Sequence, residues 1–200
     1  MGSSTGSRAL PVFVITGQSG AGKGTLIKRL LQQFPELELA VSATTRAQRP
    51  GEVDGVHYYF ISDEEFERRL ADGAFLEYHV FTWGQRSGTL FSEIERIAAA
   101  GRVCVLELET EGALAVADHV PEAVTVFVTA PLPELERRLR ERATESAGEI
   151  DERLEVAAQQ LRVAGSFDHV VENRDLDEAM AELARIVRSR LAPAATMPPR

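Results

Sequence analysis

The stretch VFVITGQSGAGKGT, residues 12–25, decides the fold of this 200-residue chain. It opens with a run of β-branched and aromatic residues between Pro11 and Gly17, which predicts a short buried strand. After the glycines, apolar residues recur at helical spacing until Pro35 and predict one face of a helix; they are Leu26, Ile27, Leu30, Leu31 and Phe34. A glycine-rich turn between a buried strand and a helix is an arrangement that binds phosphate.

Residues 17–25 match the P-loop pattern G-x-x-x-x-G-K, although Gly24 separates Lys23 from the hydroxyl residue Thr25. The glycines let backbone N–H groups turn inward and form an anion nest at a helix N-terminus. Lys23 adds a cation that reaches the outer phosphates of a nucleoside triphosphate. We therefore predict that these residues bind phosphates: Gly17, Gln18, Ser19, Gly20, Ala21, Gly22, Lys23, Gly24 and Thr25.

Further apolar runs occur at 103–108, 124–128 and 169–171, and helical patterns lie next to them. Alternating strands and helices predict an α/β fold with a parallel sheet that is flanked by helices. Residues 42–88 break this alternation and predict an α+β insertion that contains a short helix, Asp63 to Ala71. We therefore expect a P-loop core at 9–41 and 89–191, and disordered tails at 1–8 and 192–200.

The composition excludes several classes of protein. Twenty-two Lys+Arg against 31 Asp+Glu give a net charge of −9, which argues against nucleic-acid and membrane-surface partners. A single cysteine, Cys104, excludes a disulfide framework, and we expect it in a buried strand. We expect a cytoplasmic protein, since no apolar signal core is present at the N-terminus. The histidines lack metal-ligand spacing and are expected at the surface or in packing; they are His57, His79, His119 and His169.

A second motif, SATTRAQRPGEVDG at residues 42–55, is followed by Tyr58 and Glu77 and resembles the guanylate kinase family. The resemblance includes Arg138-Leu139-x-x-Arg142, Glu152-Arg153-Leu154 and Phe167 through Asn173. It runs from about the first predicted strand to Leu191, which is nearly the whole chain. It implies transfer of the γ-phosphoryl group of ATP to GMP or dGMP with Mg²⁺. It also implies that the 42–88 insertion binds GMP and that a small helical lid at 138–153 closes over ATP.

The resemblance implies a role for each matching residue. Arg46 and Arg49 would clamp the GMP phosphate. The Glu77 carboxylate would accept hydrogen bonds from guanine N1–H and N2, a donor pair that adenine lacks. The implied GMP-binding residues are Ser42, Arg46, Arg49, Tyr58, Glu77, Thr89 and Glu109. The implied catalytic residues are Lys23, Arg46, Arg138, Arg142 and Arg153. The resemblance also implies that Asn173 lies beside adenine, and that Thr25 and Glu107 orient Mg²⁺, with Glu107 acting through water.

The chain departs from the family pattern after Glu77, because Ser87 stands where a second phosphate-binding tyrosine is expected. One hypothesis is that Arg86 replaces this tyrosine with a charge. Two alternatives to a guanylate kinase stay open: a diverged P-loop kinase for another small phosphorylated acceptor, and a catalytically inert module that binds protein. The intact Lys23 and glycine loop disfavour the inert module. A monomer and a homo-oligomer are both compatible with the sequence.

Overall fold

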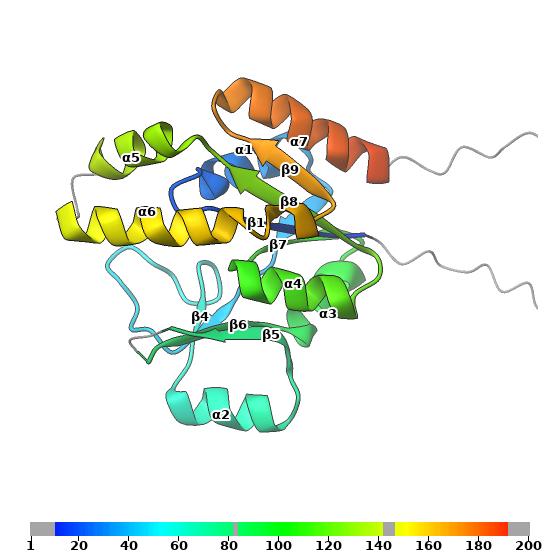
Figure 1. Cartoon of the computed structure of the whole chain (residues 1–200). Coiled ribbons are helices and arrows are strands. Elements are labelled where there is room, and N and C mark those ends of the chain that lie inside the picture. The colour runs from blue at the N-terminus through cyan, green and yellow to red at the C-terminus, as the bar shows by residue number, and fades with distance from the viewer. Residues whose placement is uncertain (1–10, 82–83, 142–146, 192–200) are drawn as a thin grey trace, which may run out of the picture.

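The computed structural model describes residues 11–81, 84–141 and 147–191 of the chain. Five parallel strands form the main sheet (Figure 1). Their order across the sheet is β2 (Leu37–Leu39), β7 (Val103–Glu107), β1 (Val12–Gly17), β8 (Ala123–Thr129) and β9 (His169–Glu172). The parallel sheet predicted from the apolar runs is confirmed, and β2 is an additional strand at its edge.

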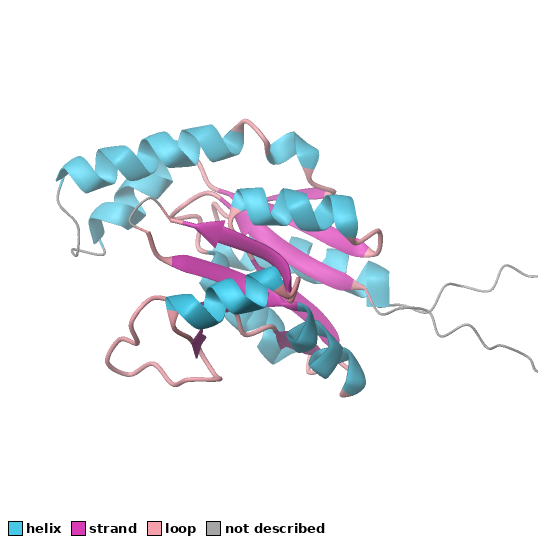
Figure 2. Cartoon of the chain, turned by 90° about the horizontal axis from the view of Figure 1, so that it is seen from below, coloured by secondary structure: helices cyan, strands magenta, loops and turns pink. Residues whose placement is uncertain are grey.

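Helices cover both faces of the main sheet, so its central strands are buried on each side, as Figure 2 shows. The core on one face includes α1 (Lys23–Gln33) and α7 (Leu176–Leu191). The core on the other face includes α3 (Phe91–Ala99) and α4 (Thr110–His119), and Cys104 is buried in it as predicted. These two cores hold the carboxyl ends of β1 and β7 rigidly, and ligands of open α/β sheets bind at such ends.

A pair of helices stands beside the glycine-rich turn (Figure 1): α5 (Leu132–Glu141) and α6 (Ala147–Leu161). Leu135 of α5 and Ala157 of α6 are buried in the core that also contains α1. Residues 142–146, which include the predicted lid residue Arg142, lie outside the described residues, as do both predicted tails. A 3₁₀ helix (Ala164–Ser166) then leads into β9.

The insertion forms its own four-stranded sheet with the order β4 (Tyr59–Phe60), β3 (Ala43–Thr44), β6 (Arg86–Leu90) and β5 (Phe75–Val80). Helix α2 (Asp63–Ala71) packs on one face through Phe66, whose ring stacks on Phe75 with centroids 4.4 Å apart. The helix begins after Ser62, whose hydroxyl accepts a hydrogen bond from Glu65 N–H and caps it. Strand β6 crosses the predicted boundary at residue 88 and leads directly into α3.

A buried carboxylate joins the insertion to the core. Glu93 of α3 accepts hydrogen bonds from Val41 N–H (3.0 Å), the Tyr59 hydroxyl (3.1 Å) and Arg96 Nε (3.0 Å). Burial alone would raise the pKa of Glu93, but these hydrogen bonds outweigh it and lower the pKa. Because Val41 precedes β3 and Tyr59 begins β4, this one side chain fixes where the insertion starts relative to α3.

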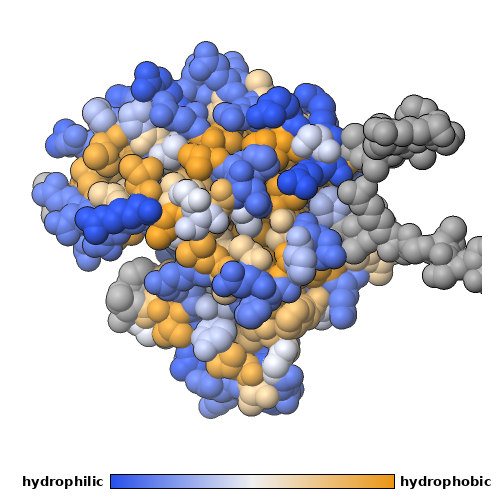
Figure 3. Space-filling model, turned by 45° about the vertical axis from the view of Figure 1, so that its right-hand side comes forward, coloured by the Kyte–Doolittle hydropathy of each residue, from blue (hydrophilic) through white to orange (hydrophobic). Residues whose placement is uncertain are grey.

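The exposed surface mixes hydrophilic side chains with small apolar groups (Figure 3). Isolated exposed apolar side chains of this kind are normal on globular proteins; examples are Val56, Val80 and Val170. In the described part of the chain, no helix is both long enough and apolar enough to cross a membrane.

Candidate active site

The glycine-rich turn lies between β1 and α1, where the sequence predicts it. Gly22 caps α1 with φ of +88°, and a Cβ there would lie 2.7 Å from Asn173 Nδ2, so only glycine fits. The Lys23 ammonium donates to the carbonyls of Gly17 (2.9 Å) and Gln18 (3.2 Å). Burial lowers the pKa of Lys23, and the charges of Glu109 and Glu107 oppose that shift. The loop therefore presents a partly desolvated cation at the end of β1.

Side chains from other elements hold the loop in shape. The buried Gln18 amide donates to the carbonyl of Ala157 (3.0 Å) and accepts from the Thr129 hydroxyl (2.5 Å) and Ala130 N–H (3.0 Å). Gln160 of α6 accepts a hydrogen bond from Ser19 N–H (2.9 Å). The Gln18 side chain therefore connects the loop to β8 and α6. Since the side chain is used in these contacts, the backbone of Gln18 is the part that can bind phosphate, as predicted for this residue.

Two predicted residues from distant parts of the chain meet at the loop. Asn173 Nδ2 donates to the carbonyl of Ala21 (2.7 Å), and Arg138 donates to the same carbonyl (3.3 Å) and to the carbonyl of Asn173 (2.8 Å). Glu134 accepts from Arg138 Nε at 2.8 Å. The Asn173 Oδ1 atom is buried and has no hydrogen-bond partner among the described residues. Arg153, also predicted, lies on α6 with a partly exposed side chain.

A cavity of about 260 Å³ opens between the loop and the insertion. It brings together six of the predicted site residues from both sides: Lys23, Ser42, Tyr58, Glu77, Glu107 and Glu109. Withdrawal from water raises the pKa of Glu107, an effect that Lys23 opposes and Glu109 reinforces. The end of the cavity at the loop therefore carries the cation of Lys23, and the rest of its lining includes carboxylates and hydroxyl groups.

Glu77 is a buried carboxylate fixed from two sides. Its Oε1 accepts a hydrogen bond from Thr89 N–H (2.9 Å), the residue that faces it across β5 and β6. On the other side, Gly112 of α4 is so close that a Cβ there would lie 2.6 Å from Glu77 Oε2. Burial raises the pKa of Glu77 despite the hydrogen bonds from Thr89. A buried carboxylate held in one orientation can read a pair of donors on a ligand.

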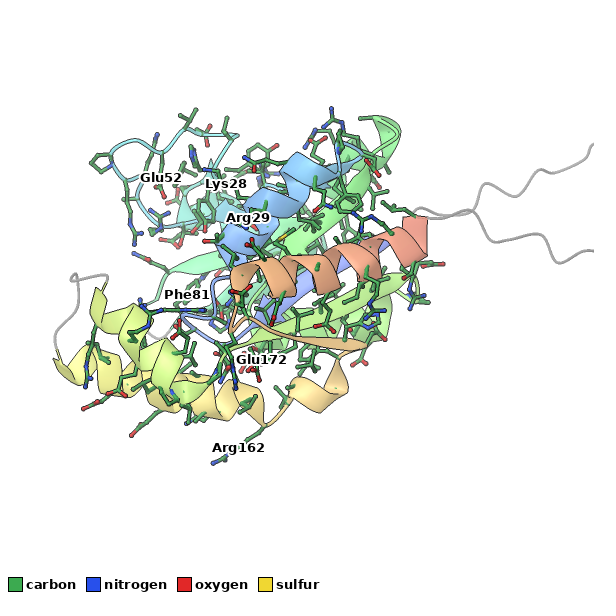
Figure 4. All side chains as sticks on the ribbon, turned by 90° about the horizontal axis from the view of Figure 1, so that it is seen from above. Lys28, Arg29, Glu52, Phe81, Arg162 and Glu172 are labelled. Carbon is green, nitrogen blue, oxygen red and sulfur yellow. The ribbon has the colours of Figure 1, made fainter. Side chains whose placement is uncertain are left out.

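Arg46, in the insertion after β3, forms a two-pronged ion pair. Its guanidinium donates to both oxygens of Glu52 (2.8 and 3.0 Å) and lies 5.2 Å from the ring centroid of Tyr58. Glu52, labelled in Figure 4, also accepts from Arg49 N–H (2.8 Å). Hydrogen bonds from Arg46 lower the pKa of Glu52 to about 2. Glu52 is not among the site residues that the sequence predicts, yet it occupies the guanidinium fork that a phosphate would fill.

One expectation for this region is wrong, because Arg86 does not replace the missing tyrosine at the cavity. Arg86 pairs with Glu67 of α2, and its guanidinium lies 5.9 Å from the Phe66 ring centroid. Neighbouring residues of a strand point to opposite faces, so Arg86 faces α2 while Ser87 lines the cavity. His57 and His79 also line the cavity. The described residues contain no group of three or more His, Cys, Asp or Glu side chains that could hold a metal ion.

The comparisons with known proteins cover nearly the whole chain. A family model described as "Guanylate kinase" matches residues 10–190. A guanylate kinase of Synechococcus elongatus is 47% identical over 179 residues, which are 89% of this chain and 97% of that protein. One of Symbiobacterium thermophilum is 44% identical over 182 residues, with 90% and 86% covered. The crystal structure of guanylate kinase from Anaplasma phagocytophilum matches with a TM-score of 0.72 at 26% identity, covering 92% of this chain and 87% of that one.

Proposed function

The chain belongs to the guanylate kinase family, and we propose that the cavity between the P-loop and the insertion is where it transfers the γ-phosphoryl group of ATP to GMP or dGMP. The single observation that carries the proposal is that Lys23 and Glu77 line one cavity. A phosphate-binding cation and a buried, oriented carboxylate therefore face the same space from opposite sides.

The P-loop side holds the donor. Backbone N–H groups of residues 17–25 cradle the ATP phosphates at the N-terminus of α1, and Lys23 neutralises charge on the outer ones. Arg138 lies against the loop at Ala21, within reach of a bound triphosphate, and Arg142 and Arg153 complete the arginine set expected from the sequence. The unpartnered Oδ1 of Asn173 supports its place beside adenine, since an exocyclic amino group would satisfy it.

The insertion side holds the acceptor. Glu77 accepts from the two guanine donors, with Ser42, Thr89 and Glu109 around the base. The GMP phosphate takes the fork of Arg46 and displaces Glu52 from it, and Arg49 and Tyr58 add further donors. This arrangement catalyses by positioning and charge neutralisation, because the transfer needs no covalent intermediate on the protein.

The residues present fit Mg²⁺ that enters with ATP. Mg²⁺ keeps several waters and is held by one or two protein oxygens together with substrate phosphates. Glu107 lines the cavity and the hydroxyl residue Thr25 lies on the first turn of α1, so each supplies an oxygen near Lys23. Bound Mg²⁺ would supply positive charge to the phosphate oxygens. We place the enzyme in the cytoplasm, where its substrates ATP and GMP occur.

The test is coupled ADP formation with GMP, dGMP, AMP, CMP and UMP as acceptors, with and without Mg²⁺. Rapid turnover with GMP and dGMP, which is lost when EDTA removes the metal, is expected. Turnover with a different phosphorylated acceptor would favour the diverged kinase instead. An absence of turnover with every acceptor, from protein that still melts cooperatively, would favour the inert protein-binding module.

A further inference from the structure

His79 lines the cavity but has no part in the proposed phosphoryl transfer. It lies on β5 two residues after Glu77, so both side chains project from the same face of the insertion sheet. Both line the cavity, and the His79 side chain is 29% exposed. In the pairing of β5 with β6, Glu77 is opposite Thr89 and His79 is opposite Ser87. The two pairs form successive rungs on the cavity face.

The two residue pairs lie in the same order as the base and the phosphate of a bound nucleotide. The Glu77 rung meets the base in the proposed function. The next rung continues from His79 through Ser87 to Thr44, since Ser87 also pairs with Thr44 of β3. Arg46, the proposed phosphate ligand, follows Thr44 by two residues. The His79 rung is therefore displaced from the base toward the phosphate.

Ser87 itself is poorly suited to bind that phosphate. Its hydroxyl donates to the carbonyl of Ala43 (3.2 Å), so its one hydrogen is already used. Directly opposite residues of an antiparallel pair have Cβ atoms about 5 Å apart. The imidazole of His79 can therefore reach the space over β6 that the short Ser87 side chain does not fill.

The His79 ring is held by neighbours on two elements. Its Nδ1 lies 3.5 Å from Glu111 Oε2 in the first turn of α4, and its ring meets that of Phe81 edge-on with centroids 4.7 Å apart. Figure 4 shows Phe81 on the side of the insertion that faces the α5 and α6 pair. The contact with Glu111 uses Nδ1, so the second ring nitrogen, Nε2, is the atom that can meet a ligand.

We propose that His79 binds GMP by donating a hydrogen bond from its imidazole to the phosphate, in place of a donor from Ser87. The proposal rests on the proposed function, because it takes its ligand from it. It assigns His79 to the phosphate and not to the base, and this separates it from Glu77. It predicts that the contribution of His79 appears only with ligands that carry the phosphate.

The experiment compares GMP with guanosine, which has the same base and sugar and lacks the phosphate. Dissociation constants are measured by calorimetry for the full chain, and the KM for GMP by coupled assay. In His79→Ala we expect GMP to bind about 10- to 150-fold more weakly, the range for one charge-assisted hydrogen bond, and guanosine to bind as in the wild type. His79→Gln keeps an N–H donor and is expected to recover part of the affinity. His119→Ala, at the far end of α4, is the matched control.

Three outcomes would overturn the proposal: equal weakening of GMP and guanosine, no change in either, or a loss in His79→Gln as large as in His79→Ala. Thermal melting of each variant separates lost binding from lost folding, and His79→Gln answers the question if the alanine variant does not fold. Failure of the proposed function is a different result, since the wild type would then form no ADP with GMP. A wild type that turns over GMP normally while His79→Ala leaves its KM unchanged refutes the role of His79 alone.

Discussion

Gly112→Ala is expected to damage guanine recognition from outside the cavity lining. Gly112 lies in the first turn of α4, and a Cβ there would lie 2.6 Å from Glu77 Oε2 and 3.3 Å from Cδ. Ordinary contact begins near 3.4 Å, so the carboxylate has to retreat by about 0.8 Å. Hydrogen bonds of charged groups have a narrow distance range, and a shift of this size breaks or badly bends those to guanine.

The magnitude follows from the number of bonds at risk. One hydrogen bond to a charged group contributes about 1.5–3 kcal/mol, so the loss of one alone weakens GMP binding about 10- to 150-fold. The fold itself is expected to be little affected. Alanine is favoured over glycine in a helix by up to about 1 kcal/mol, which offsets the strain at Glu77. For a protein of this size, 1 kcal/mol corresponds to about 2–4 °C in the thermal midpoint.

Steady-state kinetics with GMP and with AMP, together with the KM for ATP, provide the assay. We expect a raised KM for GMP, a smaller preference for GMP over AMP, and an unchanged KM for ATP. Gly165→Ala is the control, because a Cβ at Gly165 meets no atom within 4 Å. If Gly112→Ala left the GMP to AMP ratio of kcat/KM as in the wild type, Glu77 would not be the group that reads guanine.

The remaining predictions concern four side chains. Lys23→Ala is expected to abolish turnover with a thermal midpoint close to wild type, because the hydrogen bonds of its ammonium go to the loop carbonyls of Gly17 and Gln18; a substantial residual rate in the coupled assay would contradict the P-loop assignment. Glu77 must be ionised to accept from guanine, so as pH falls through its raised pKa the inhibition constant of guanosine should increase, and Glu77→Gln should remove that dependence. Ser87→Tyr should lower the KM for GMP, and more strongly in a His79→Ala background, since both side chains serve the same phosphate. Burial raises the pKa of Cys104 to about 12, so a thiol reagent at neutral pH should label it only after denaturation.

Much of the core could be predicted because buried parallel strands are continuous apolar runs. The runs that begin at Val12, Val103 and Val124 therefore show as strands in the sequence. Strand β2 could not, because Leu37–Leu39 is only three residues long and alternates with a glutamate at the sheet edge. Helix α4 was likewise not delimited, since Thr110–His119 contains small residues on several sides and only a weak apolar face.

The site divides in the same way. Roles that depend on a local motif can be predicted: the glycine-loop pattern predicts that of Lys23, and the resemblance of residues 42–55 to guanylate kinase implies that of Arg46. Roles that depend on contacts across the fold cannot be predicted in this way. Glu93 is a charged residue in a helix sequence, and only the tertiary structure brings Val41 and the Tyr59 hydroxyl to it. His79 shows its importance only when the β5–β6 register places it opposite Ser87.

The buried amide of Gln18 has a consequence for how fast the nucleotide is captured. Because Gln18 is anchored to α6 and β8, the entropy of ordering the loop is lost during folding and not when ATP arrives. Capture is then a simple docking step, so the observed rate should rise linearly with ATP concentration in stopped-flow mixing and show one exponential phase. In Gln18→Ala the loop would have to become ordered each time ATP binds. Because that ordering step does not depend on ATP concentration, the observed binding rate would level off at high ATP concentration.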